Sequence, residues 1–167
     1  MKAFTRADRG LVSAEFEPVE AALLTQLASQ VAGVLSTRRD DAAPADPVLA
    51  RLLPDAYADS DDAAEFRRFT ADGLGARKIG NAQRIIADVA ECLTAETETA
   101  VLLDEAAVGA WLRSLTDIRL MLAVRLGISD SDVDDPAPPS DELLMLGDIY
   151  DWLGWVQDSL VDAVDEP

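Results

Sequence analysis

A long apolar segment at residues 104–127 places the strongest constraint on how this chain can fold. On a helical wheel its hydrophobic side chains cover almost the whole circumference, which is typical of a helix buried inside a protein. The largest are Trp111, Leu112, Leu115, Ile118, Leu120, Met121, Leu122, Val124 and Leu126. Charged residues interrupt the segment at Arg113, Asp117, Arg119 and Arg125, so it is unsuited to spanning a membrane. We therefore expect the other helices to pack around this one.

Helical periodicity recurs elsewhere, so the chain is predicted to be a mainly α-helical bundle around this buried central helix. Hydrophobic residues follow three- and four-residue steps across residues 18–37, 62–93 and 141–164, which predicts three further long helices. Gly73 and Gly75 each cost about 1 kcal/mol in a helix interior, so we expect a break or kink there. The length of 167 residues suits one domain, residues 1–167.

The N-terminal residues 2–16 alternate between apolar and polar side chains, which predicts a β-hairpin that turns at Gly10. Residues 99–103 favour β-structure and predict a short third strand beside the hairpin. A two-stranded ribbon is only marginally stable alone, so we expect it to lie on the helices. Residues 38–62 contain several prolines and are predicted to be a loop. One short helix, at residues 47–53, would interrupt this loop, with Asp46 as its N-cap.

The net charge is −18, from 32 acidic and 14 basic residues. Nucleic-acid backbones and anionic lipids bind to cationic surfaces, so neither autonomous nucleic-acid binding nor membrane binding is expected. A protein partner with a basic surface would be attracted, because such fields speed the encounter. The alternative is that the negative charge only keeps the protein soluble.

The residue types that are missing exclude several classes of enzyme. There is no histidine, so Ser–His and Cys–His nucleophile pairs and His-ligated metal sites cannot form within this sequence.

The acidic, proline-rich loop at residues 129–140 begins like a calcium-binding EF-hand, but Asp135 replaces its glycine and Asp141 its final glutamate. We expect no catalytic, cofactor or metal site. An enzyme that uses carboxylates and a divalent metal is the least favoured alternative.

Cys92 is the only cysteine, so no disulfide can form within these residues. It lies in an apolar helical stretch, where a free cysteine usually acts as an inert small hydrophobe. The first residues contain no apolar segment of the kind found in secretion signals. These features predict a cytoplasmic protein.

The last predicted helix carries the candidate partner-binding surface. One side is an apolar seam that suits packing on another helix, formed by Leu146, Ile149, Leu153, Val156, Leu160 and Val164. The opposite arc, which we call the acidic arc, consists of Asp148, Asp151, Trp155, Asp158 and Asp162. A tryptophan among aspartates suits a basic, partly apolar partner, since tryptophan is frequent at binding hot spots.

Two alternatives to partner binding at the acidic arc remain open. Another helix or the hairpin would cover Trp155, which we favour because large aromatic side chains are usually buried. Separately, the apolar seam would pair across a homodimer, which would make the protein a self-associating scaffold or adaptor.

Arg119 lies among hydrophobic residues of the central helix, so we expect it to enter the core and pair with Glu65 or Glu91. We interpret this ion pair as structural. The other basic residues of the middle region are Arg67, Arg68, Arg77, Lys78 and Arg84. These residues would form a basic strip that contacts an acidic partner or nucleic acid, or they would provide the internal counter-charge of the fold, which is the interpretation we prefer.

Four segments, at residues 46–57, 64–74, 110–128 and 150–161, resemble in sequence and order an actinobacterial domain-of-unknown-function family. The resemblance also includes the N-terminal hairpin. It implies a small cytoplasmic protein related to an actinomycete oxidative-stress regulator that works through a sigma factor. We therefore expect a non-enzymatic regulator of transcription that binds a protein. A disulfide switch within the chain would need a second thiol besides Cys92.

Overall fold

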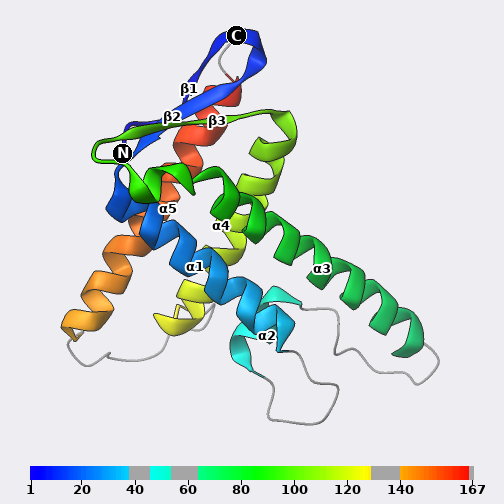
Figure 1. Cartoon of the computed structure of the whole chain (residues 1–167). Helices are drawn as coiled ribbons and strands as arrows, with labels where there is room; N and C mark the ends of the chain where they lie inside the picture. Colours follow the sequence, from blue (N-terminus) through cyan, green and yellow to red (C-terminus); the bar gives the residue numbers. More distant parts are fainter. Residues whose placement is uncertain (38–45, 54–63, 129–139, 166–167) are drawn as a thin grey trace.

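A computed structural model confirms a mainly helical fold organised around the predicted central helix, α4 (Glu105–Arg125). The structure describes residues 1–37, 46–53, 64–128 and 140–165, and for residues 64–72 only the backbone. Four helices surround α4 and contact it: α1 (Pro18–Ser36), α2 (Pro47–Leu52), α3 (Ala64–Asp88) and α5 (Asp141–Asp165). Figure 1 shows the N-terminal part of α3 extending away from the other helices.

The predicted hairpin and third strand are both confirmed, and together they form one antiparallel sheet at one end of the helices (Figure 1). The strands are β1 (Thr5–Arg6), β2 (Val12–Phe16) and β3 (Thr99–Leu103). The central strand is β2, and its register places Ala14 opposite Val101. The turn uses two positive φ angles, 61° at Arg9 and 76° at Gly10, and glycine adopts the second without strain.

The sheet is attached to α4 through three aromatic rings. The ring centroid of Trp111 lies 5.6 Å from that of Phe4 and 5.8 Å from that of Phe16, and both phenylalanines come from the N-terminal segment. The indole N–H of Trp111 donates a hydrogen bond to Asp88 Oδ2, 2.8 Å away. Trp111, which is itself fully buried, therefore joins the sheet, α4 and the end of α3.

Local sequence signals fix the starts of three helices. The predicted N-cap Asp46 accepts a hydrogen bond from the Val48 N–H at 2.9 Å, and Asp104 accepts one from the Ala107 N–H at 2.7 Å. At the start of α1, Glu17 and Glu20 form a capping box.

Within the described residues, α1 alone is long and apolar enough to cross a membrane by length and composition. Core helices of globular proteins meet the same two criteria. The buried side of α1 consists of Ala21, Leu24, Leu27, Ala28, Val31 and Leu35. These residues belong to the hydrophobic core of the protein, so packing inside the fold accounts for the apolar side of α1.

The expected break at Gly73–Gly75 is wrong, because α3 continues through both glycines to Asp88. Contacts of α3 with α1 and α4 along its described part offset the low helix propensity of glycine. The break comes later than predicted, between Asp88 and a short 3-10 helix, η4 (Glu91–Thr94).

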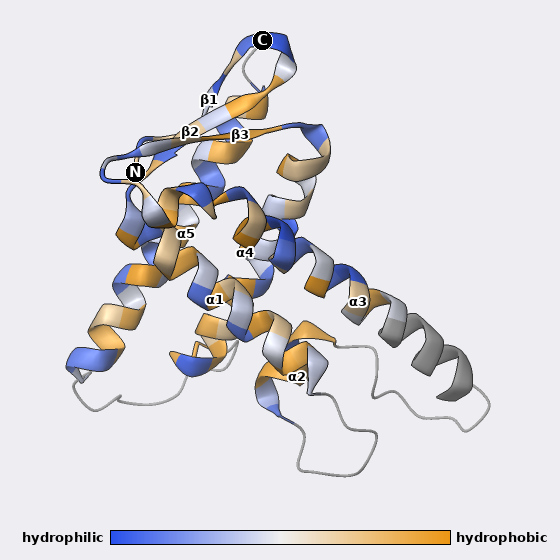
Figure 2. Ribbon diagram, in the orientation of Figure 1, coloured by the Kyte–Doolittle hydropathy of each residue, from blue (hydrophilic) through white to orange (hydrophobic). Residues whose placement is uncertain are grey.

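The apolar seam of α5 packs inward over its middle. Leu153, Val156 and Leu160 are buried, while Leu146 and Ile149 pack partly against the core. The last member of the seam, Val164, is 43% exposed. Figure 2 shows hydrophobic and hydrophilic residues alternating along α5, as expected for a helix with one buried side.

Replacing Trp111 with alanine should destabilise the protein by about 3–5 kcal/mol, because the change leaves a cavity and removes the donor to Asp88. The exposed Trp155 provides a matched control, since Trp155→Ala should change stability by less than about 1 kcal/mol. Urea denaturation followed by circular dichroism measures both. Equal losses in the two variants would contradict the proposed role of Trp111.

Candidate interaction site

The acidic arc of α5 is exposed along its whole length. Trp155 is 45% exposed, and the arc's four aspartates, Asp148, Asp151, Asp158 and Asp162, are all exposed. The expectation that another element covers Trp155 is therefore wrong. The N-terminal ribbon reaches α5 one turn later, where the backbone N–H of Phe4 donates to Ser159 Oγ at 3.5 Å.

The negative charge of the arc is not neutralised within the described part of the chain. No described basic side chain forms an ion pair with any of its four aspartates. The arc therefore combines a large aromatic side chain with free negative charge. Such a surface can bind a basic protein, because the partner's cations and an apolar pocket would both find complements.

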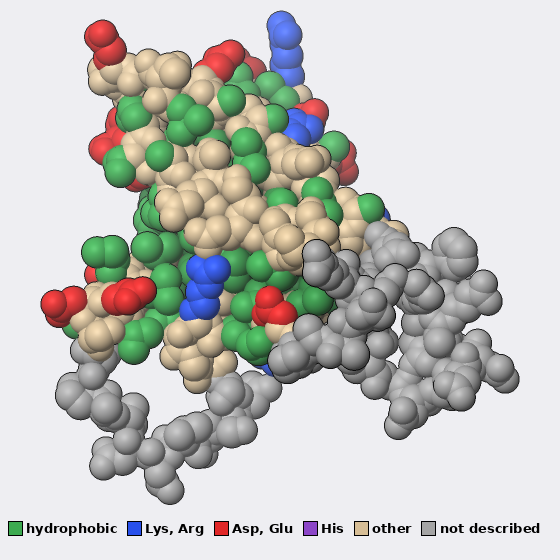
Figure 3. Space-filling model, turned by 60° about the horizontal axis from the view of Figure 1, so that its bottom comes forward, with side chains coloured by type: hydrophobic (Ala, Val, Ile, Leu, Met, Phe, Trp, Pro, Cys, Tyr) green, Lys and Arg blue, Asp and Glu red, His purple; other side chains and the backbone are tan. Residues whose placement is uncertain are grey.

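Hydrophobic side chains are also exposed after the end of α4 and in the first turns of α5. Leu144 and Met145 in the first turns of α5 are 53% and 66% exposed, and Ile128, just after α4, is 53% exposed. Figure 3 shows hydrophobic side chains on the face that includes this end of the bundle. Single exposed hydrophobic residues are common on protein surfaces, so we assign no binding role to these three.

The buried charge of the central helix is Asp117, which is 2% exposed. Its Oδ1 accepts a hydrogen bond from Lys78 Nζ of α3, and the two side chains form an ion pair. Burial raises the pKa of Asp117, and the nearby Lys78 opposes that rise. Sequence reasoning missed this pair because its members are 39 positions apart.

The predicted ion pair of Arg119 with Glu91 is not formed. Arg119 Nη1 donates to Gln157 Oε1 at 3.1 Å, and its guanidinium carbon lies 4.7 Å from the ring centroid of Tyr150. Glu91 is exposed on η4, and the side chain of the other candidate, Glu65, lies outside the described residues. A neutral amide and an aromatic face are therefore the neighbours of this guanidinium, and its buried Nε has no hydrogen-bond partner.

Some of the basic residues of the middle region form ion pairs within the fold, and one does not. Lys78 forms an ion pair with Asp117, and the Nε of Arg84 lies 2.9 Å from a carboxylate oxygen of Asp88. Both cations therefore provide internal counter-charge, which is the interpretation that we preferred from the sequence. Arg77 is exposed and has no ion pair with a described residue. The side chains of Arg67 and Arg68 lie outside the described residues, as do residues 129–139 of the EF-hand-like loop.

A groove of about 810 Å³ lies between α3, α4 and α5, beside the Lys78–Asp117 pair. Leu74, Leu112 and Val161 provide its apolar lining. Over the described ranges, no three acidic, cysteine or histidine side chains gather as metal ligands, in the groove or elsewhere.

Residues 1–164 match the model of a protein family described as Domain of unknown function (DUF2017). The chain belongs to the DUF2017 family. This confirms the resemblance found in the sequence.

Mycobacterial proteins are similar to this chain over most of its length. The AosR protein of Mycobacterium leprae (strain TN) is 30% identical over 173 residues, which cover 88% of this chain and 79% of the relative. The protein of Mycobacterium tuberculosis (strain ATCC 25618 / H37Rv) named oxidative stress regulator AosR is 28% identical over 170 residues, covering 86% of this chain and 78% of the relative. No solved structure gives a significant match.

The only cysteine of this DUF2017 chain is poorly placed to react with oxidants. Cys92 is fully buried, and its Sγ lies 3.7 Å from the carbonyl oxygen of Thr99, to which it donates. Burial raises the pKa of Cys92, so the thiol stays protonated and weakly nucleophilic.

In the native protein, Cys92 should react with a disulfide reagent such as DTNB more than about 100-fold slower than in the urea-unfolded chain, because reaction needs local opening. Absorbance of the released thiolate measures the rate, with Cys92→Ala as the blank. Fast native labelling would show that this thiol is accessible.

Replacing Lys78 with methionine should destabilise the protein by about 3–5 kcal/mol at pH 8, because Asp117 is left as a buried, uncompensated anion. The loss should shrink as the pH falls through the raised pKa of Asp117, since the protonated acid needs no counter-charge. Denaturation of both proteins at pH 8 and pH 5 measures the difference.

Lys78→Met combined with Asp117→Asn provides the control, because it removes both charges and should be stable independently of this titration. A loss in Lys78→Met that does not depend on pH would contradict the role assigned to Asp117.

Proposed function

We propose that this protein is a cytoplasmic, non-enzymatic regulator of the oxidative-stress response that acts by binding a protein partner through the acidic arc of α5. The names of the mycobacterial relatives support the regulatory role. The single observation that carries the binding site is Trp155, which is 45% exposed within a row of unpaired aspartates.

Electrostatics define the kind of partner. With a net charge of −18 the protein repels nucleic acid, so a role in transcription is best filled through a protein that itself contacts DNA. Such proteins carry basic surfaces, and a sigma factor is the partner we favour. Its cations would approach Asp151, Asp158 and Asp162, while Trp155 would enter an apolar pocket.

Self-association through the apolar seam of α5 is the weaker candidate. Leu153, Val156 and Leu160 already pack against the chain's own core, so the middle of the seam is occupied. A second copy could contact only the ends of the seam, so this arrangement is less favoured.

Affinity capture with the full chain as bait tests the proposal. The bait is presented to an actinobacterial lysate prepared after oxidative stress, and the recovered proteins are quantified by mass spectrometry. Trp155→Ala should weaken capture of the specific partner by about 2 kcal/mol or more, as expected for a hot-spot residue. Replacing Asp151, Asp158 and Asp162 with asparagine should slow association and reduce its dependence on salt.

The matched control replaces Glu91, Glu96 and Glu105 with glutamine. These residues are also exposed, lie outside the arc and change the net charge by the same amount. The control bait should recover the partner as the unaltered bait does. Equal recovery by all four baits would show that the partner binds elsewhere.

A further inference from the structure

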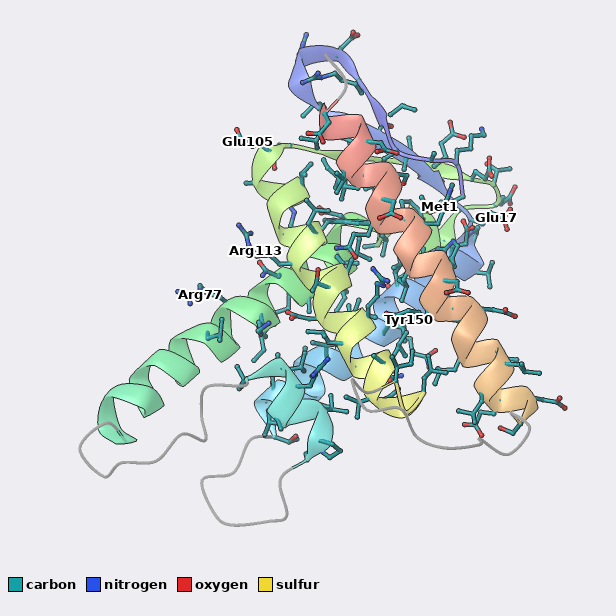
Figure 4. All side chains as sticks on the ribbon, turned by 180° about the vertical axis from the view of Figure 1, so that it is seen from behind. Met1, Glu17, Arg77, Glu105, Arg113 and Tyr150 are labelled. Atoms are coloured by element: carbon teal, nitrogen blue, oxygen red, sulfur yellow. The ribbon has the colours of Figure 1, made fainter. Side chains whose placement is uncertain are left out.

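Two arginines on neighbouring helices carry positive charge that no described acidic group neutralises. Arg77 projects from α3 and Arg113 from α4, on the same side of the molecule (Figure 4). Lys78 and Arg84, in contrast, are engaged in ion pairs. Gly109 gives Arg113 room, since a Cβ at that position would lie only 3.2 Å from the guanidinium Nη1. In a chain with 32 acidic residues, unpaired guanidinium groups define a distinct surface.

Both arginines line the groove of about 810 Å³ between α3, α4 and α5. This volume lies within the range of about 300–1,000 Å³ found for small-molecule sites. Lys78 also lines the groove, but its charge is matched by Asp117. The positive charge that the groove offers to a ligand therefore comes from Arg77 and Arg113.

The rest of the lining suits the hydrocarbon part of a ligand. Leu74 comes from α3, Leu112 from α4 and Val161 from α5, and Val161 is 40% exposed. Asp117, at the same groove, keeps one carboxylate oxygen, Oδ2, buried without a hydrogen-bond donor. A hydroxyl or N–H group on a ligand would satisfy that acceptor, because an unpaired buried oxygen is costly.

We propose that the groove between α3, α4 and α5 binds a small amphipathic organic anion. Its acidic group lies between Arg77 and Arg113, and its apolar body lies on the leucines and valine of the lining. Guanidinium groups bind carboxylate and phosphate through paired, charge-assisted hydrogen bonds, which favours an acid over an alcohol of the same length. The site is separate from the acidic arc, so this inference does not rest on the proposed function.

Binding is tested with 8-anilinonaphthalene-1-sulfonate, a fluorescent amphipathic anion, titrated into the full chain. Its fluorescence should rise and saturate at one site per chain. Decanoate should displace it, whereas the uncharged decan-1-ol should compete at least about tenfold less well. Absence of saturable binding, or equal competition by the acid and the alcohol, would overturn the proposal.

Two variants locate the site. Arg77→Gln with Arg113→Gln removes the cations, and Val161→Asp places a negative charge in the lining. Each should weaken the binding of decanoate at least about tenfold. Near-ultraviolet circular dichroism of the tryptophans confirms that each variant is folded.

Each variant has a control matched in charge and exposure. Arg9→Gln with Arg125→Gln removes two cations outside the groove, and Val164→Asp changes a valine of similar exposure on the same helix. Both controls should retain binding within about twofold. Equal losses in variants and controls would show that the anion binds through overall charge and not in the groove.

Discussion

The burial of Trp111 is the contact on which the rest of this structure depends. Its ring joins Phe4 and Phe16 of the N-terminal segment to α4, and its N–H binds Asp88 at the end of α3. A three-stranded sheet this small has little stability of its own, so it requires such a contact with the helices. Because the same side chain also contacts α3, it sets how α3 lies against the central helix.

The position of α3 in turn determines where charge can be buried. With α3 beside α4, Lys78 reaches Asp117, and the helix that carries the chain's core can hold a carboxylate inside it. Arg119, on another side of α4, donates one hydrogen bond to Gln157 and lies over the ring of Tyr150, both on α5. In addition to the hydrophobic core, polar contacts of α4 with α3 and α5 therefore help to fix the arrangement of the bundle.

The two surfaces that this arrangement leaves exposed have opposite charge. The acidic arc lies on the outer side of α5, and Arg77 and Arg113 line the groove between α3, α4 and α5. A regulator with both could bind a basic protein at one surface and an organic acid at the other. Since Cys92 is buried and its pKa is raised, a signal delivered through the groove would be an alternative to oxidation of this thiol.

The sequence by itself determined the local structure: the buried central helix, the hairpin with its third strand, and the cap at Asp46. These depend on periodicity and on residues within a few positions of one another, which can be recognised without a fold. Only the tertiary structure decided that Lys78 neutralises Asp117, that α3 continues through Gly73 and Gly75, and that Trp155 stays exposed. The physical reason is that each depends on which distant segment covers a given side chain or helix, and that is fixed by packing of the whole chain.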